Sequence, residues 1–248
     1  MTVEKCIPAK CGICDKTANF ALNKNSYDIY RCSGCGFLFV HPYPSDSEIT
    51  EFYNNNYRDI DTDFYPKARS RQRRTFIRSF RFWKYIFNKR VLDVGCGGGF
   101  MVNAFRRLGA DAHGMDISEN SIAYARKHFP ACTFHCENFD SMSKSNLVFD
   151  FIFTTELLEH IAGTHEFMEM IVAISRPGTI VYLATPDSGH ETVPADISLW
   201  TDICPPAHLQ WFNQSNMALL FGNYGFELVR AFRKKTPALS MLFRRRDG

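Results

Sequence analysis

Hydrophobic residues make up 45% and charged residues 22% of the 248 positions, and the formal net charge is +3. These values exclude an intrinsically disordered chain and predict a globular protein with room for one α/β domain and a small accessory module. No apolar run approaches the ~18 residues of a transmembrane helix, and the N-terminus lacks the apolar segment of a signal peptide. We therefore expect a cytoplasmic protein in which the nine cysteines are thiols or metal ligands.

Two CxxC motifs lie near the N-terminus. Cys11 and Cys14 form the first, Cys32 and Cys35 the second, and 17 residues separate the two motifs. This spacing is typical of a four-cysteine zinc site, which is closed and therefore structural. A redox CxxC normally begins a helix beside a βαβ unit, which is not the setting here. We predict a zinc ribbon with these four ligands. The other five cysteines are expected to be ordinary thiols, and only Cys6 is close enough in sequence to serve as an alternate ligand.

Three segments differ in composition and define the expected domains. Residues 1–44 form the cysteine-rich zinc ribbon, residues 45–89 a helical linker or cap, and residues 90–248 an α/β domain. Ser45 is a suitable N-cap for the linker, with Glu48 three residues later as its capping-box partner.

The end of the linker is strongly basic. Ten Lys or Arg residues and no acid lie between Lys67 and Arg90. We predict a helix that packs an apolar face on the domain and exposes a basic face to solvent. The charge also leaves open an anionic acceptor, an anionic membrane surface or RNA as a partner. The apolar residues at helical spacing are Phe76, Phe80, Trp83 and Phe87.

From residue 90 onward, strand-like apolar runs alternate with helical patterns. This alternation predicts an α/β fold with a Rossmann-like, doubly wound sheet, in which ligands bind beyond the carboxyl ends of the strands. The expected strands are Arg90–Val94, Ala112–Asp116, Thr133–Cys136, Phe149–Thr154, Thr179–Thr185 and Phe226–Lys234. The expected helices are Phe100–Leu108, Ser118–His128, His165–Ser175 and Gln214–Tyr224, and Arg244–Arg246 is expected to be a solvated end.

A glycine-rich turn follows the first of these strands. After Asp93 the glycines have the spacing Gly95-x-Gly97-x-Gly99, and the next strand ends in Asp116. Glycines let the backbone approach a ligand, and an acid after the second strand can accept hydrogen bonds from ribose hydroxyls. Together they predict an adenosine-containing cofactor. NAD remains possible, but its usual spacing is G-x-G-x-x-G, and a carboxylate at position 93 would repel a pyrophosphate while suiting an ammonium group.

Several motifs resemble those of class I S-adenosylmethionine-dependent methyltransferases. The run VLDVGCGGG (91–99) resembles their first motif and GMDIS (114–118) their second. The run FDFIFTTELLEHI (149–161) resembles the fourth-strand motif of the ubiquinone-biosynthesis O-methyltransferase branch, and HLQWF (208–212) resembles a late signature of that branch. Bacterial members also have a zinc ribbon followed by paired tyrosines, which would be Tyr53 and Tyr57. The resemblance covers nearly the whole chain.

The resemblance implies a set of cofactor contacts. The methionine end would lie at the glycine turn, the ribose at the acid after the second strand, and the adenine beside residues after the second and third strands. Backbone after the fourth strand would lie near the sulfonium. The implied residues are, in this order, Asp93, Gly95, Cys96 and Gly97; Asp116; Ile117, Asn138 and Phe139; and Thr155 and Glu156.

Two histidines at the expected ligand-binding edge are candidate general bases. His160 ends the fourth-strand motif, and His208 lies in an insertion after the fifth strand. A base removes the proton of a hydroxyl acceptor, and histidine titrates near neutral pH. A purely structural role remains open for both. Glu159 is expected to cap a helix, with the orientation of His160 as the alternative role. No comparable setting surrounds His41, His113, His128, His135, His165 or His190.

The resemblance implies a methyltransferase that uses S-adenosylmethionine and a structural Zn²⁺ ion. Its acceptor would be a small molecule, at a hydroxyl of a sugar, a lipid-linked compound or a secondary metabolite. An RNA methyltransferase that uses the ribbon and the basic helix, and a non-catalytic cofactor-binding scaffold, stay open. Nucleic acid is disfavoured because exocyclic-amine methyltransferases resemble one another in a D/N-P-P-aromatic motif, whereas this chain has Thr155-Glu156-Leu157 there.

Overall fold

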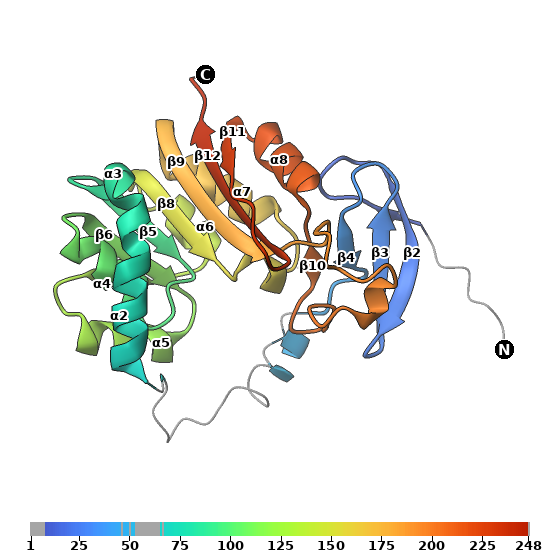
Figure 1. The fold of residues 1–248 in the computed structure, drawn as a ribbon, viewed down its shortest axis with the longest axis horizontal. Helices are drawn as coiled ribbons and strands as arrows, with labels where there is room; N and C mark the ends of the chain where they lie inside the picture. Colours follow the sequence, from blue (N-terminus) through green and yellow to red (C-terminus); the bar gives the residue numbers. More distant parts are fainter. Residues whose placement is uncertain (1–7, 46, 50, 53–64, 66, 248) are drawn as a thin grey trace.

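The computed structural model describes residues 8–45, 47–49, 51–52, 65 and 67–247 (Figure 1). Cys6, Tyr53 and Tyr57 lie outside the described residues. Ser45 and Glu48 form the expected capping box. The Ser45 N–H donates to Glu48 Oε2 at 2.8 Å, and the Glu48 N–H donates to Ser45 Oγ at 3.4 Å.

Seven strands form the main sheet. They are β5 (Arg90–Val94), β6 (Asp111–Asp116), β7 (Thr133–Cys136), β8 (Phe149–Thr155), β9 (Ser175–Pro186), β11 (Phe226–Ala231) and β12 (Ala238–Arg245). Their order is β11-β12-β9-β8-β5-β6-β7. The strands from β5 to β9 pair in parallel, and β12 is antiparallel to its neighbours. Because β6 and β8 flank β5, the strand order reverses there, which places a ligand site at the carboxyl ends of β5 and β8.

Helices cover both faces of this sheet (Figure 1). They are α4 (Phe100–Arg107), α5 (Glu119–His128), α6 (Phe139–Ser143), α7 (His165–Ala173) and α8 (Gln214–Asn223). The Rossmann-like fold and the four helices expected from the sequence are thereby confirmed.

Strand β8 shows why the sheet strands are continuously apolar. Phe149 and Ile152 belong to a core cluster that includes residues of α7 and α8, whereas Phe151 and Phe153 belong to a cluster with residues of α4. The apolar side chains of β8 are therefore buried on both faces, as expected for a parallel sheet between two helical layers.

The C-terminus differs from the sequence-based expectation. The single strand expected over Phe226–Lys234 is shorter, and the chain returns as β12 between β11 and β9. Met241 and Phe243 are fully buried in β12. Arg244 and Arg245, expected in a solvated end, belong to this strand because its apolar residues complete the core.

A second, smaller sheet joins the cysteine-rich segment to a distant part of the chain. Its strands are β1 (Ala9–Lys10), β2 (Thr17–Lys24), β3 (Tyr27–Cys32), β4 (Leu38–Val40) and β10 (Gln210–Trp211), in that order. In Figure 1, β10 lies beside β4 at the junction of the two sheets. Trp211 is fully buried, in a cluster with Ile29 and Leu38. The insertion after β9 is thus part of the small sheet.

The basic linker forms three short helical elements: α2 (Ala68–Ser79), the 3₁₀ turn η1 (Phe80–Phe82) and α3 (Trp83–Ile86). The expectation that the apolar face packs on the domain is wrong for Phe80 and Trp83, which are exposed. Phe87 is 47% exposed, but its ring covers Gly109 of the α/β domain. Phe82 and Ile86 are buried instead. The 3₁₀ turn has three residues per turn rather than 3.6, which changes the helical register after α2.

Candidate active site

The glycine loop (Gly95–Gly99) connects the carboxyl end of β5 to α4. The backbone N–H groups of Gly95 and Cys96 donate to Met115 O at 2.8 and 2.9 Å, which fixes the loop to β6. Gly99 has φ +76°, and a β-carbon there would lie 2.7 Å from the ring of Phe134. Only glycine therefore allows this turn to pack so closely against β7.

Two carboxyl groups lie at the base of the glycine loop. Asp116 ends β6, where its Oδ2 accepts from the Gly97 N–H at 2.8 Å and its Oδ1 from the Ser118 N–H at 2.9 Å. Asp93, in β5, is only 5% exposed. Burial, and secondly the Asp116 carboxylate, raise the pKa of Asp93 well above its usual range. This pair of acids would be stabilised by a cationic ligand.

The other residues expected at the adenine and sulfonium are placed as follows. Ile117 is 75% exposed beside Asp116, so its apolar side chain is available to a ligand. Asn138 Oδ1 accepts from the Ser141 N–H at 2.9 Å and thereby caps α6. The Phe139 ring packs on Phe167, with 5.6 Å between ring centroids. The side chains of Asn138 and Phe139 are therefore engaged within the protein.

Thr155 and Glu156 lie at the carboxyl end of β8, next to the glycine loop. Glu156 has φ +53°, and its N–H donates to Ala184 O at 2.9 Å. The next side chain, Leu157, would lie 3.2 Å from a β-carbon on Gly95. The loop after β8 therefore directly adjoins the glycine loop.

Tyr65 also contacts the glycine loop, although no sequence motif surrounds it. Its hydroxyl would lie 3.2 Å from a β-carbon on Gly97 and donates to Ser121 Oγ at 3.3 Å. The ring packs edge-on against Phe100, at 5.4 Å between centroids, and the Arg71 guanidinium lies 5.3 Å from its centre. Tyr65 thus covers the loop from the linker side.

The fold brings His160 and His208 together from segments far apart in the sequence. Their ring centroids are 4.9 Å apart and their planes cross at 72°. His160 Nδ1 lies 2.7 Å from Ala207 O, and His208 Nδ1 lies 2.9 Å from Asp202 O. A carbonyl oxygen only accepts, so Nδ1 carries the proton in both rings and Nε2 is the basic nitrogen.

Glu159 lies close to the two histidines, and its side chain bonds to another strand rather than capping a helix. Its side chain is fully buried, and its Oε2 accepts from Thr185 Oγ1 at 2.8 Å. The Leu209 N–H donates to Glu159 O at 2.7 Å, which ties the loop after β8 to the insertion that carries His208. The ligand atoms of Glu159, His160 and His208 lie within 4.8 Å of one another, so this cluster could hold a proton or a metal ion.

Burial disfavours the charged forms of three groups in this cluster, Glu156, Glu159 and His208. Desolvation raises the pKa of Glu159 to about 7, and desolvation followed by the Glu159 carboxyl raises the pKa of Glu156 to about 7. Burial, and secondly His160, lower the pKa of His208. His208 is therefore favoured in the neutral form that can accept a proton.

The four cysteines of the two CxxC motifs converge in the small sheet. Their sulfur atoms all lie within 4.8 Å of one another, with Cys11 Sγ 3.7 Å from Cys35 Sγ and Cys14 Sγ 3.3 Å from Cys32 Sγ. Tetrahedral zinc with ~2.3 Å bonds places its sulfur ligands ~3.8 Å apart. The observed donor set fits such an ion.

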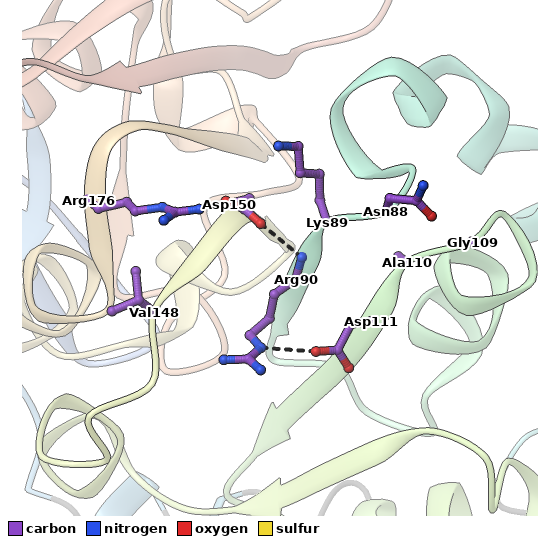
Figure 2. A pocket seen from close by; sticks show the side chains of 9 residues that line it. All are labelled: Asn88, Lys89, Arg90, Gly109, Ala110, Asp111, Val148, Asp150 and Arg176. Carbon is purple, nitrogen blue, oxygen red and sulfur yellow. Dashed lines mark hydrogen bonds and ion pairs between the residues drawn. The ribbon is translucent and has the colours of Figure 1, made fainter.

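A cavity of about 570 Å³ lies at the amino ends of the parallel strands, whereas the glycine loop lies at their carboxyl ends (Figure 2). Four of the five charged residues that line the cavity are paired: Arg90 Nε donates to Asp111 Oδ2 at 3.0 Å, and Arg176 donates to Asp150. It is lined by the amino ends of β5 and β6, away from the glycine loop. Because ligands of doubly wound sheets bind at the carboxyl ends, we do not assign the active site to this cavity.

One histidine pair was missed by the sequence reasoning. His113 Nδ1 lies 3.0 Å from His135 Nε2, with the rings stacked at 5.3 Å, and His113 also lies 3.3 Å from Asp111. The two histidines come from adjacent strands, β6 and β7. Only the strand register reveals that they are neighbours, because 21 residues separate them in the chain.

Comparisons with known proteins agree with this architecture. Residues 62–231 match the family described as Methyltransferase domain. The ubiquinone biosynthesis O-methyltransferase of Sinorhizobium fredii is 33% identical over 100 residues, 39% of this chain and 40% of that protein. The enzyme of the same name from Coxiella burnetii is 30% identical over 152 residues, 57% of this chain and 64% of that protein. The matches thus span less than two thirds of these relatives.

Solved structures show the same fold at low sequence identity. The magnesium protoporphyrin IX methyltransferase of Synechocystis PCC 6803, determined with bound SAM, has a TM-score of 0.55 and 17% identity, covering 83% of this chain and 99% of that one. The CcbJ methyltransferase of Streptomyces caelestis has a TM-score of 0.56 and 14% identity, covering 79% and 96%. The chain therefore belongs to the methyltransferase-domain family of enzymes and has the class I fold of S-adenosylmethionine-dependent methyltransferases.

Proposed function

We propose that the chain binds S-adenosylmethionine at the glycine loop and transfers its methyl group to a hydroxyl of a small-molecule acceptor. The observation that carries this proposal is the convergence of His160 and His208, each with Nε2 as its basic nitrogen. His160 lies in the segment after β8, which contacts the glycine loop through Leu157. The names of the curated relatives, which are O-methyltransferases, support a hydroxyl as the acceptor group.

The cofactor site fits a cation. Bound S-adenosylmethionine supplies an electrophilic methyl group on a sulfonium and also carries an ammonium group. A carboxylate at Asp93 would attract the ammonium group, whereas it would repel the pyrophosphate of NAD. Asp116 is already oriented by the Gly97 and Ser118 N–H groups and retains lone pairs for the ribose hydroxyls. Ile117 would cover the adenine.

The histidine pair would act on the acceptor. Holding the acceptor oxygen in line with the methyl group lowers the activation free energy by up to ~7–11 kcal/mol in favourable systems. Neutral His208 or His160 accepts the hydroxyl proton at Nε2, which adds ~10²–10⁴-fold when the acceptor must ionise. The carbonyls of Ala207 and Asp202 keep Nδ1 protonated, and the buried Glu159 carboxyl can balance the imidazolium charge.

The four cysteines would hold a structural Zn²⁺ ion. The donor set is closed, since all four sulfur atoms face one another, so the metal would stabilise the small sheet and leave no position for substrate.

Calorimetric titration tests the cofactor. Wild type should bind S-adenosylmethionine and S-adenosylhomocysteine but not NAD, and Asp116→Ala should weaken binding. Asp111→Ala is the matched control, because Asp111 begins the same strand, at the far edge of the sheet. No binding by the folded, zinc-containing protein would contradict the proposal.

An acceptor screen, which follows S-adenosylhomocysteine release, tests the base. His160→Asn and His208→Asn should lower kcat by ~10²-fold or more and leave cofactor binding intact. Cofactor binding without turnover on any hydroxyl acceptor would favour a scaffold. Zinc analysis of wild type and of the same variants distinguishes a general base from a metal ligand. If wild type holds a second metal equivalent and the variants lose it, Glu159, His160 and His208 form a metal site.

A further inference from the structure

A row of large apolar side chains is exposed on the linker. Ile77, Phe80, Trp83 and Phe87 have exposed fractions of 61%, 54%, 51% and 47%. Single exposed apolar residues are common, but a contiguous set marks an interaction site. We call these four side chains, with the basic residues around them, the basic-aromatic face.

The 3₁₀ turn aligns these side chains. Residues three apart eclipse in a 3₁₀ helix, so Phe80 and Trp83 project in the same direction across η1. The Trp83 and Phe87 rings are 5.4 Å apart. Phe82 and Ile86 point the opposite way into the core. The chain thus buries one apolar side of this segment and exposes a second.

The face is positively charged without internal compensation. Arg73, Arg74, Arg78 and Lys84 are exposed around the apolar row. Within the described residues, no basic side chain of α2, η1 or α3 forms an ion pair, and the sequence has no acid between residues 67 and 90. An anionic partner would therefore complement this face.

The positive field extends to a second element. Burial, and then the Arg81 and Arg78 guanidiniums, lower the pKa of Lys234, which follows β11. Arg81 itself donates to Tyr182 and lies over its ring, so it is held by the fold. Basic groups from two separate parts of the chain therefore gather at the edge of the basic-aromatic face.

We propose that the basic-aromatic face binds peripherally to an anionic lipid bilayer. Exposed Trp and Phe side chains favour the interface between headgroups and acyl chains, and Arg and Lys bind the anionic headgroups. A branched aliphatic side chain in the row, Ile77, favours lipid over RNA, because bases stack on flat rings. No helix among the described residues is long and apolar enough to cross a bilayer, so the contact is with its surface.

Co-sedimentation with vesicles tests this proposal. The full chain should bind phosphatidylcholine vesicles that contain phosphatidylglycerol, bind pure phosphatidylcholine weakly, and lose affinity in high salt. Trp83 fluorescence should shift to the blue on binding. The other two tryptophans, Trp200 and Trp211, are 5% and 0% exposed and should report no change.

Matched variants separate the apolar and charged contributions. Phe80→Ser/Trp83→Ser should weaken vesicle binding by about tenfold or more, whereas Leu199→Ser, at a side chain 70% exposed elsewhere, should not. Arg73→Glu/Arg74→Glu should also weaken it. Arg31→Glu/Lys127→Glu makes the same change in net charge on other exposed residues and should have a smaller effect.

Three outcomes would overturn the proposal. One is no binding to phosphatidylglycerol vesicles by folded wild type. Another is an equal loss of vesicle binding in the control variants, which would indicate a general charge effect. The third is salt-sensitive binding of single-stranded RNA that Phe80→Ser/Trp83→Ser abolishes, without vesicle binding, which would assign the face to nucleic acid. Unchanged melting temperatures would show that the variants remain folded.

Discussion

Replacement of Gly99 by alanine should destabilise the protein for two separable reasons. A left-handed φ of +76° costs a residue with a β-carbon ~1–2 kcal/mol. The new methyl group would also lie 2.7 Å from the Phe134 ring and 3.0 Å from Ala125 Cβ. Phe134 is only 6% exposed, so it cannot move away freely, and such overpacking costs ~1–3 kcal/mol. We expect a total loss of ~2–5 kcal/mol in the free energy of unfolding.

Gly178→Ala is the matched control for this experiment. Gly178 has φ +85°, but no heavy atom lies within 4 Å of its would-be β-carbon. It should lose only the ~1–2 kcal/mol of backbone strain. The lower entropy of the unfolded chain affects both variants alike and cancels in the comparison. Urea denaturation followed by circular dichroism measures both losses. Equal losses of unfolding free energy in the two variants would refute the reasoning, because the contact with Phe134 would then add nothing to the destabilisation.

Three further predictions concern metal, pH and a buried carboxyl. Cys32→Ser should lose the zinc equivalent and lower the melting temperature; unchanged metal content would contradict the proposed site. Burial lowers the pKa of His113 and of His135, so the unfolded chain binds more protons, and stability should fall as pH decreases below ~6.5. His113→Phe/His135→Phe should flatten this slope in denaturation curves, and an unchanged slope would argue against it. Thr185→Val removes the hydroxyl bonded to Glu159 and should cost ~1–3 kcal/mol of unfolding free energy, whereas Thr185→Ser should be milder.

The parallel core was predictable from the sequence. Strands buried on both faces are continuous apolar runs, and β8 (FDFIFTT) is an example. Helix ends were predictable where a cap exists, as at Ser118, whose Oγ accepts from the Ser121 N–H at 3.2 Å. These signals are local, so periodicity and capping chemistry suffice to find them.

The remaining features depend on contacts between distant segments. Strand β10 has only two residues and gains its partner from the first 40, which no local pattern indicates. The expected packing of Phe80 and Trp83 on the domain was wrong because a 3₁₀ turn has no clear sequence signal. The candidate site likewise combines one feature found from a local sequence pattern and one that depends on a contact between distant segments. The glycine loop was visible as a motif, but the meeting of His160 with His208 follows from the Leu209 N–H bond to Glu159 O.

The pairing of β4 with β10 also has a consequence for synthesis of the chain. Leu38 pairs with Trp211, so the nascent N-terminal module emerges from the ribosome with β4 as an open edge. That edge stays unpaired until more than 170 further residues have been made. Unpaired edges invite intermolecular pairing, and such a long-range closure slows folding. Early metal capture by the nascent cysteines would hold the module in shape during this interval.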